Sequence, residues 1–539
     1  GQYPQTWGAY AAMQTLDQID AAEISLLQRG EILYHLEQHE QSIEALERYR
    51  LARPFGFHST AHLYSGLAYH ALGRYEDAVE QFDKVIREFA WTAVAGDAWM
   101  AKARTLAALG EEPSTLYQEF VKRYPDHPRA PEALWRAAVG LERRGDWEQA
   151  GGFYGALCDE YGDDSRAEEA CFRHGLAAYA VGDHHHALEL WERTLAALPP
   201  DAGPAGDSSS RARALTWMGL ASAAAGEKES AEALWRDAAG LAPESYYALR
   251  ARDLIAADPL RLSVYPAVHV PPFELSSDNW QQIEEWVQGW APGEGDPHGP
   301  IEEQTLVRRG DALWALGWHD GALDAYRQHR DAVAGEAQSL LALLRHSFQR
   351  DVLAMVISCA ERLIWMGRAA DAEEPPRALL WLAYPTAYGH LVHSEAEPLG
   401  IDPLLFLALV RQESQFNPHV TSWAGAVGLA QVMPQTGAWI AQKLGPEAYD
   451  DALLLRPVVS VRYGVWYLAG AQDVCGDNWP AAAASYNAGW TNVGQWIGDE
   501  AIRDFDLFYE TIPFAETQAF VRLVYENYRA YQRIYQPRF

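Results

Sequence analysis

The fold is decided by the stretch Ala68-Tyr69-His70-Ala71-Leu72-Gly73-Arg74-Tyr75-Glu76-Asp77-Ala78. A Gly stands near its centre, and an aromatic residue and an Ala follow shortly after it. Gly adopts the positive φ of a tight turn without strain, and a small Ala lets two paired helices approach closely. The stretch therefore predicts a helix, a tight turn at Gly73 and a second helix.

The same arrangement recurs along the chain. Glycines with similar surroundings are Gly73, Gly110, Gly145, Gly182, Gly226 and Gly317, and the first four intervals between them are 37, 35, 37 and 44 residues. Intervals of this length indicate stacked helix-turn-helix units. The pattern resembles tetratricopeptide-type repeats over residues 20–255, and the drifting interval makes these repeats degenerate. A stacked array of such pairs forms a curved superhelix.

The chain divides into four predicted regions. They are a helical-repeat superhelix at 1–257, a Pro- and Gly-rich linker at 258–300, a further helical linker domain at 301–383 and a C-terminal domain at 384–539. In the second region, prolines and glycines interrupt the helical pattern. No run with a period of two residues indicates a strand, so we expect a mainly all-α fold up to the final domain.

Composition and charge exclude several classes of protein. A hydrophobic content of 49% excludes a disordered chain. The chain has 43 Lys and Arg against 74 Asp and Glu, a net charge of −31, which would repel the phosphates of a nucleic acid. The uncharged stretch 478–498 holds too many polar residues for a bilayer span. We therefore expect no nucleic-acid partner and no transmembrane segment.

The four cysteines stand far apart, at Cys158, Cys171, Cys359 and Cys475, without a CxxC motif. We interpret them as buried free thiols rather than as metal ligands or disulfide partners. The sequence also lacks the pattern of a calcium-binding loop. It thus predicts no metal and no cofactor.

A candidate catalytic helix begins at Asp402-Pro403, where the Asp can cap the helix and the Pro suits its first turn. Leu405, Leu409 and Glu413 follow at intervals of four residues, so they share one helical face. That face is otherwise apolar. Glu413 is therefore predicted to lie on a buried stripe.

The helix should end within 414–417, because Pro418 disfavours helix at the residue before it. Apolar surroundings and a helix C-terminus both disfavour a carboxylate, so we expect a raised pKa for Glu413. A raised pKa lets a general acid hold its proton near neutral pH. Position alone also allows a structural ion pair of Glu413 with Arg411 or Arg522.

Four motifs then follow in order. They are Arg411-Gln412-Glu413-Ser414-Gln415-Phe416-Asn417-Pro418, Gly425-Ala426-Val427-Gly428-Leu429-Ala430-Gln431-Val432-Met433-Pro434 after Ser422, Ala484-Ser485-Tyr486-Asn487-Ala488-Gly489, and Phe508-Tyr509-Glu510-Thr511-Ile512-Pro513-Phe514-Ala515-Glu516-Thr517. Together they resemble the soluble lytic murein transglycosylase family over residues 384–539. The upstream helical superhelix fits the larger members of that family. The resemblance implies a lysozyme-like α+β domain at the C-terminus.

The resemblance implies that one carboxylate, Glu413, acts as acid and then as base. Glycoside cleavage usually needs two carboxylates, and no second acid follows Glu413 at short range. In the family, the N-acetyl group of the substrate's muramic sugar is thought to take the part of the nucleophile. Glu413 would protonate the bond between N-acetylmuramic acid and N-acetylglucosamine and then deprotonate the C6 hydroxyl. The product is a 1,6-anhydromuramyl end, and no water is consumed.

The family's motifs also imply roles for other residues. Tyr486 would lie close to Glu413 and assist catalysis, and the substrate-binding residues would be Ser422, Gln431, Met433, Asn487 and Glu510. By themselves, Ser422 and Met433 could equally cap a turn and fill a core. Glu510 either contacts sugar hydroxyls and tunes the cleft or pairs with Arg522.

Two positions depart from the family's pattern. Ala430 stands where the family usually has Met, and we expect the smaller side chain to widen the wall of the cleft. Trp490-Thr491 replaces a frequent Pro-Gly after the third motif, which should change how the next loop covers the cleft.

Two other functions remain open at this point. A goose-type lysozyme has a related fold but hydrolyses its substrate, and it would need an additional Asp to activate water. A non-catalytic scaffold would instead use the helical repeats to bind protein partners. We expect peptidoglycan glycan strands as the partner, with the superhelix as a further surface for proteins. The chain begins at Gly1 without a Met, so we expect that a signal peptide is absent from this sequence. The family resemblance implies a periplasmic or cell-envelope protein.

Overall fold

The computed structural model describes residues 25–56, 58–198, 207–257, 273–293, 298–445, 449–476, 478–497 and 504–536. Regular structure in these residues is helical, with no named strand among them. Two isolated antiparallel bridges pair Thr421 with Val427 and Val427 with Val432. The mainly all-α fold is thus confirmed, and the β component of the described C-terminal domain consists of these two bridges. No described helix is both long enough and apolar enough to cross a membrane.

The chain forms two compact units, residues 1–238 and 239–539. The predicted end of the repeat region at residue 257 therefore differs from the boundary between the units. Residues 239–257 belong to the second unit, because their side chains pack against its C-terminal helices, as described below.

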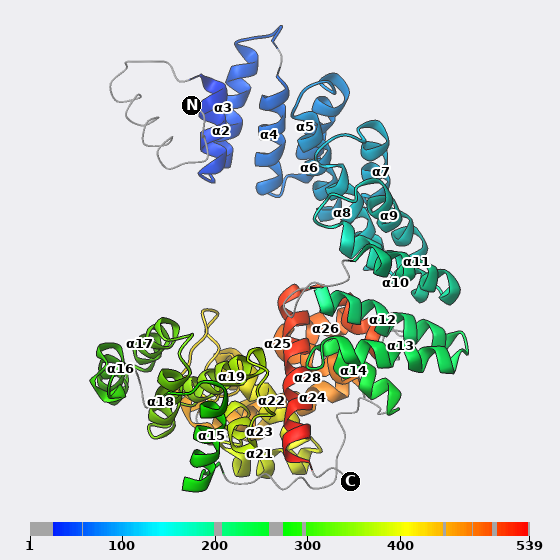
Figure 1. Ribbon diagram of the computed structural model, residues 1–539. Coiled ribbons are helices and arrows are strands. Elements are labelled where there is room, and N and C mark those ends of the chain that lie inside the picture. The colour runs from blue at the N-terminus through cyan, green and yellow to red at the C-terminus, as the bar shows by residue number, and fades with distance from the viewer. Residues whose placement is uncertain are drawn as a thin grey trace. The chain divides into compact units, whose positions relative to one another are not determined.

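The first unit consists of successive paired helices (Figure 1). Its helices are α2 (Leu26–His35), α3 (His39–Leu51), α4 (Ser59–Ala71), α5 (Tyr75–Glu88), α6 (Ala95–Ala108), α7 (Ser114–Arg123), α8 (Ala130–Glu142), α9 (Trp147–Glu160), α10 (Ala167–Ala180), α11 (His184–Ala197), α12 (Asp207–Ala224) and most of α13 (Lys228–Leu241). The turn glycines of the sequence pattern, Gly73, Gly110, Gly145, Gly182, Gly226 and Gly317, have φ values from 73° to 89°, as predicted.

A second recurring glycine lies inside the first helix of a pair and lets a large side chain of the second helix pack against its backbone. The pairs with this relation are Gly66 with Phe82, Gly175 with Trp191, Gly219 with Trp235 and Gly310 with Tyr326. The indole of Trp191 is buried and donates to the carbonyl of Phe172 at 3.0 Å. Close approach of the paired helices therefore depends on the absence of a Cβ.

The expectation of four free thiols is wrong for two of the cysteines. Cys158 of α9 and Cys171 of α10 form a disulfide, with their Cα atoms 5.0 Å apart, whereas Cys359 and Cys475 are free and buried. No motif in the sequence marks this pairing, because it is the packing of α9 against α10 that brings the two residues together. Closing a loop of this size stabilises a fold by about 3 kcal/mol.

The second unit contains the remaining helices, with three short 3₁₀ helices among them. They are α14 (Tyr246–Ile255), α15 (Ser277–Trp290), η1 (Ile301–Glu303), α16 (Thr305–Ala315), α17 (His319–Ala332), α18 (Ala337–Phe348), α19 (Leu353–Ala369), α20 (Arg377–Ala383), α21 (Gly389–Ala396), η2 (Glu397–Leu399), α22 (Pro403–Ser414), α23 (Pro434–Leu444), η3 (Asp451–Leu455), α24 (Pro457–Cys475), α25 (Trp479–Ala488), α26 (Trp490–Trp496), α27 (Phe505–Thr511) and α28 (Ala515–Tyr535).

The predicted linker at 258–300 contains a helix. Its residues 258–272 and 294–297 lie outside the described part of the chain, but α15 occupies the segment between them. Ser276 and Asn279 form a capping box at the start of α15, and Ile283 and Val287 are fully buried. The density of prolines around α15 obscured this short amphipathic pattern.

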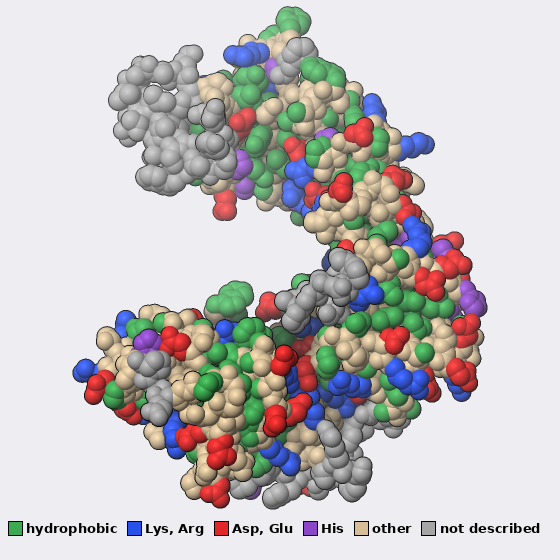
Figure 2. Space-filling view, in the orientation of Figure 1, with side chains coloured by type: hydrophobic (Ala, Val, Ile, Leu, Met, Phe, Trp, Pro, Cys, Tyr) green, Lys and Arg blue, Asp and Glu red, His purple; other side chains and the backbone are tan. Residues whose placement is uncertain are grey.

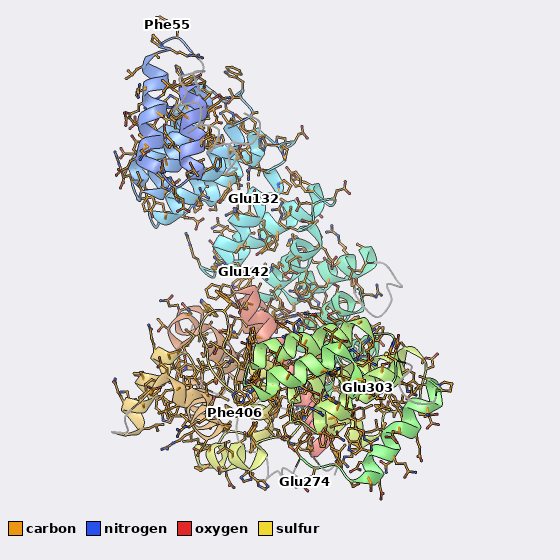
Figure 3. The ribbon with its side chains drawn as sticks, turned by 90° about the vertical axis from the view of Figure 1, so that its left-hand side faces the viewer. Phe55, Glu132, Glu142, Glu274, Glu303 and Phe406 are labelled. Carbon is orange, nitrogen blue, oxygen red and sulfur yellow. A yellow bond between two sulfur atoms is a disulfide. The ribbon has the colours of Figure 1, made fainter. Side chains whose placement is uncertain are left out.

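Helix α28 runs beside α22 and α25 in the centre of the second unit (Figure 1). Its four tyrosines are buried, and their hydroxyls bond three other segments of the unit. The bonds run from Tyr525 to Asp253, from Tyr528 to Asp402, from Tyr531 to the carbonyl of Pro385 and from Tyr535 to the carbonyl of Tyr384. The side chain of Phe406 on α22 lies inside the packed helices (Figure 3).

We predict that Gly175→Ala destabilises the first unit. The new Cβ would overlap the indole of Trp191, and overpacking of this kind costs about 1–3 kcal/mol. Thermal unfolding of the full chain measures the effect. The matched control is Gly152→Ala on α9, where a Cβ meets open space and should leave stability unchanged or raise it by up to about 1 kcal/mol. Equal melting temperatures for the two variants would contradict the packing argument.

Candidate active site

The N-terminus of α22 is fixed by a cap that is itself held in place. The Asp402 carboxylate accepts from the backbone N–H of Leu404 at 2.8 Å, and Pro403 occupies the first turn, as the sequence predicted. The second carboxylate oxygen of Asp402 accepts from the hydroxyl of Tyr528 at 2.7 Å. The helix that carries Glu413 therefore begins at a point bonded to α28.

The other end of α22 is held by Arg411. Its buried guanidinium donates to the carbonyl of Ala383 at 3.0 Å and to the side chain of Asn527 at 2.6 Å, and it also pairs with Glu361. Arg411 is thus engaged away from Glu413. The described partner of the other proposed cation, Arg522, is Glu526. The structural ion pair that position alone allowed for Glu413 is absent among the described residues.

The chain leaves α22 abruptly. The helix ends at Ser414, inside the predicted range, and Gln415 and Phe416 both have left-handed backbones with φ of 48° and 61°. This conformation costs about 1 kcal/mol or more for each non-Gly residue, so the surrounding packing must stabilise it. The buried side chain of Phe416 contributes this stabilisation. The sharp reversal places Glu413 at the last turn of the helix.

Glu413 has the environment expected of a carboxylic acid that keeps its proton. Leu405 and Leu409 on the same face of α22 are buried, and Glu413 itself is half-buried. Burial raises the pKa of Glu413 to about 8. No charge on another described residue contributes to this shift. The raised pKa predicted from the sequence is confirmed, and desolvation is its physical cause.

The loop between α22 and α23 is braced by its own polar groups. The hydroxyl of Ser422 accepts from the backbone N–H of Ala426 at 2.9 Å, so Ser422 caps a turn. The side-chain amide of Gln431 donates to the carbonyls of Gly428 at 2.8 Å and Val420 at 3.2 Å. Both residues therefore hold the loop in shape, while Ser422 and Gln431 remain half-buried and reachable from solvent.

Gly428 allows the loop to pack tightly against the following part of the domain. Its φ is 79°, and a Cβ there would collide with the carbonyl of Leu454. Gly425 has a φ of 89° but meets no close neighbour. Close backbone approach thus occurs at Gly428, and Gly425 supplies only the turn conformation.

The expectation that Ala430 widens a cleft wall is wrong. Ala430 is fully buried, its N–H donates to the hydroxyl of Ser460 at 3.0 Å, and its Cβ faces Gly464 on α24. A Cβ placed at Gly464 would stand 2.6 Å from the Cβ of Ala430 and 2.9 Å from the hydroxyl of Tyr486. The small pair Ala430 and Gly464 therefore brings α24 and the loop together in the core.

Tyr486 lies close to Glu413. Its hydroxyl donates to the carbonyl of Ala430 at 2.7 Å. Burial raises the pKa of Tyr486 well above its usual value, and the nearby carboxylate of Glu413 raises it further. The structure thus brings together the acid on α22 and the third motif on α25, with the second motif joined to Tyr486 through Ala430.

Trp490 packs inward at the start of α26. Its ring stacks on that of Tyr467 with 4.8 Å between centroids, and Tyr467 in turn contacts Tyr486 edge to face. Trp439 of α23 meets Trp490 edge to face at 5.5 Å. The Trp that replaces the family's Pro therefore joins an aromatic cluster that reaches the neighbour of Glu413.

Two further predicted site residues, Met433 and Asn487, are exposed. Met433 is exposed at the start of α23, and Asn487 is exposed at the end of α25. The side-chain oxygen of Asn487 accepts from the hydroxyl of Thr517 at 2.7 Å, which ties the third motif to α28. The oxygen of the Asn487 amide is therefore engaged by the protein, while the residue as a whole stays exposed.

Glu510 is placed differently from the other predicted site residues. It is 1% exposed, and its carboxylate accepts from the hydroxyl of Tyr247 on α14 at 2.8 Å. It does not pair with Arg522 among the described contacts. This burial gives Glu510 a structural link to α14, so that any action on a substrate would pass through its neighbours.

Sequence analysis missed the importance of α14 for the second unit. Arg250 makes two bonds of 2.7 and 2.8 Å with the carboxylate of Asp506, and both side chains are buried. The carboxylate of Asp253 pairs with Arg529 of α28 at 2.6 Å. Figure 2 shows acidic and basic side chains side by side over α14 and α28. The motif Ser245-Tyr246-Tyr247-Ala248 was the available signal, since both tyrosines pack against the C-terminal helices.

No group of three or more His, Cys, Asp or Glu side chains in the described ranges is arranged to hold a metal ion. The chemical resources near Glu413 are therefore one carboxylic acid with a raised pKa, a buried phenol, backbone and amide hydrogen-bonding groups and aromatic rings. Such a set suits proton transfer to and from a neutral polar substrate.

Comparison with known proteins finds similar sequences for a segment of each unit. Residues 390–508 match the transglycosylase SLT domain, and residues 27–93, 72–113 and 114–165 match tetratricopeptide repeats. The soluble lytic murein transglycosylase of Salmonella typhimurium is 37% identical over 149 residues, which is 27% of this chain and 23% of that protein. Its counterpart from Escherichia coli K12 is 36% identical over 152 residues, 28% of this chain and 24% of that protein. The aligned part thus spans about a quarter of the length of these relatives.

The fold extends beyond the aligned part. An inactive mutant of the lytic transglycosylase Slt from Pseudomonas aeruginosa superposes with a TM-score of 0.61 and 19% identity, covering 98% of this chain and 76% of that one. This likeness concerns the fold alone.

We predict that Glu413→Gln stabilises the protein at alkaline pH. The folded pKa of about 8 lies above the value of 4.5 for an unperturbed Glu, so the unfolded chain ionises first as the pH rises. Glu413 thus destabilises the fold progressively between pH 4.5 and 8, by an amount on the order of 2 kcal/mol for a half-buried group.

Melting temperatures at pH 4.5, 6.5 and 8.5 test this effect. The difference between Glu413→Gln and the natural chain should be smallest at pH 4.5 and largest at pH 8.5. Glu516→Gln, an exposed change on α28, is the control and should show no such trend. A constant difference for Glu413→Gln across this range would mean that Glu413 ionises like an ordinary Glu.

Proposed function

We propose that this chain, whose residues 390–508 match the transglycosylase SLT domain, is a member of the soluble lytic murein transglycosylase family and cleaves glycan strands of peptidoglycan. The bond is the β-1,4 linkage between N-acetylmuramic acid and N-acetylglucosamine. The observation that carries the proposal is Glu413, an acid with a pKa of about 8 that is desolvated but still reachable from solvent. Such a group is protonated at neutral pH and can donate that proton to a glycosidic oxygen.

The first step uses Glu413 as the acid. Its proton goes to the glycosidic oxygen, the bond from that oxygen to C1 of the muramic sugar breaks, and the N-acetylglucosamine part leaves with a new hydroxyl. The acetamido oxygen of the muramic sugar stabilises the positive charge at C1. This neighbouring group takes the place of a second carboxylate, which fits a site where no other described charge perturbs Glu413.

The second step uses the carboxylate left on Glu413 as the base. It removes the proton of the C6 hydroxyl of the same sugar, and the oxygen attacks C1. The carboxyl group regains its proton, and the sugar becomes a 1,6-anhydromuramyl end. Atoms balance without water. A group that acts first as an acid and then as a base works best when its pKa lies near the operating pH. The burial of Glu413 raises its pKa into that range.

The surrounding residues take supporting parts in this proposal. Tyr486 lies close to Glu413 and would steady the developing charge, while its hydroxyl is oriented by the carbonyl of Ala430. Ser422 and Gln431 hold the loop and offer polar groups to the N-acetylated sugar. Met433 would give an adaptable apolar wall, and Asn487 a hydrogen-bonding amide. Glu510 would support the site without touching the substrate, because its buried carboxylate bonds Tyr247 of α14.

The two rival functions lack these supports. A goose-type hydrolase needs a second acid to activate water, and Asp450, the Asp nearest downstream of α23 in the described chain, instead caps η3. A non-catalytic scaffold gives no reason for an acid held at a pKa of about 8. We propose the helical repeats as a further surface, for protein partners of the enzyme.

We also propose a location in the periplasm or cell envelope, where peptidoglycan is found. The disulfide between Cys158 and Cys171 supports this location, because such bonds persist in oxidising compartments.

The mass of the products tests the reaction type. Purified peptidoglycan digested with this protein should yield fragments that are one water lighter than the reducing-end products of a hydrolase. Glu413→Gln should lower cleavage by at least about 10³-fold, and Glu516→Gln should leave it unchanged. Products with ordinary reducing ends would identify a hydrolase. Full cleavage by the Gln variant would remove the one-carboxylate mechanism.

The pH profile tests the role of Glu413 as the acid. We expect kcat/KM to fall as the pH rises through about 8, because the free enzyme then loses the proton that it must donate. Glycan strands freed of stem peptides retain only the lactyl carboxylates of their muramic sugars, which are already ionised well below pH 8 and so do not change charge in this part of the profile. A profile that falls near pH 4.5 would mean that the acid is not in the environment described here.

A further inference from the structure

The loop between α22 and α23 presents one large aromatic side chain to solvent. Trp423 is 95% exposed, directly after Ser422. The loop around it is held by bonds from Gly425 N–H to the carbonyl of Ser422 at 2.9 Å and from Gly428 N–H to the carbonyl of Val420 at 2.9 Å. Burial of an indole ring is favourable by a few kcal/mol, and the exposed side chain of Trp423 does not gain this free energy. A ligand that covers the indole would recover this term.

A second exposed apolar element lies beside the same loop. The imidazoles of His319, at the start of α17, and His419, six residues after Glu413, stack in parallel with 3.8 Å between their centroids. The turn just before His319 exposes Leu316 and Trp318, which are 80% and 64% exposed. The stack therefore places this turn next to the loop. Trp423 follows His419 by four residues, a separation of at most about 14 Å along the backbone.

The two elements share an absence of charge. No Asp, Glu, Lys or Arg stands between Glu413 and Lys443, and none stands between Asp311 and Asp320. This neutrality contrasts with a chain whose net charge is −31. A glycan strand freed of stem peptides carries a lactyl carboxylate on each muramic sugar, and a stretch without acidic residues does not repel it. Indole rings also pack on the C–H faces of sugar rings.

We propose that Trp423 and the turn with Leu316 and Trp318 form an outer platform that holds the glycan strand beyond the bond being cleaved. The platform rests on the proposed function, since its occupant is the substrate of the site at Glu413. Continuity selects this occupant, because Trp423 and Ser422 belong to one rigid loop. A strand that leaves the site along this loop meets Trp423 first and the α16–α17 turn next.

The platform makes a prediction about strand length. A short fragment fills only the sites around Glu413, so its binding should not depend on Trp423 or Trp318. A long strand reaches the platform and gains the stacking contacts. Each contact of this kind contributes up to about a tenfold increase in affinity.

The test measures binding to the full chain carrying Glu413→Gln, so that no substrate is consumed. The ligands are glycan strands freed of stem peptides, in a long fraction and as a tetrasaccharide. Trp423→Ala and Trp318→Ala should each weaken binding of the long fraction about fivefold to tenfold and change tetrasaccharide binding less than twofold. Trp365→Ala is the matched control, because Trp365 is also exposed, at 57%, on α19 of the same unit. Trp423→Phe should restore most of the loss.

Other outcomes overturn the platform. Equal long-strand affinities for Trp423→Ala and Trp365→Ala would contradict it. An equal loss of affinity for both ligand lengths would also contradict it, because Trp423 would then belong to the cleavage site itself. Loss confined to strands that carry stem peptides would make the peptide the occupant, and a purified protein that competes only through these indoles would make it a protein-docking surface. Absence of any long-strand binding would overturn the platform together with the proposed function. Retained cleavage by Glu413→Gln, by contrast, would refute the mechanism alone.

Discussion

The attachment of α22 to α28 is the constraint on which the rest of the site depends. Adjacent residues of α28 hold the two ends of α22: Tyr528 bonds the capping carboxylate of Asp402, and Asn527 accepts from Arg411. A helix held at both ends cannot rotate or slide to bring a buried carboxylate into water. The desolvation of Glu413 is thus a property of this helix packing, and the raised pKa is its chemical consequence.

The same physical logic explains the shape of the loop beyond Glu413. Two left-handed residues, Gln415 and Phe416, turn the chain sharply, and Gly428 lets the returning loop touch the backbone at Leu454. Small side chains at Ala430 and Gly464 then allow Tyr486 to reach the carbonyl of Ala430. Rigid backbone contacts, rather than long side chains, bring the second and third motifs to the acid. Preorganisation of this kind spares the site a reorganisation during the reaction.

The unit that contains the site is larger than the segment that carries its motifs. Helix α14 contributes buried ion pairs to α27 and α28, through Arg250 with Asp506 and Asp253 with Arg529, and its Tyr247 bonds Glu510. Buried pairs add little net stability, but removal of one partner leaves an unpaired charge in a dry interior. Such pairs specify where α14 must dock. They make residues near 250 part of the environment of a site more than 150 residues later in the sequence.

The sequence by itself determined the features that depend on local physics. The recurring glycines required turns with positive φ, Asp402 and Pro403 started a helix, and apolar spacing put Glu413 on a buried stripe with a raised pKa. Only the tertiary structure decided which distant groups meet. The pairing of Cys158 with Cys171, the burial of Ala430 against Gly464 and the bond of Tyr247 to Glu510 each join segments that carry no mark of one another. Periodicity and capping act over a few residues and can be read along the chain, whereas a contact between helices depends on how all the helices pack together.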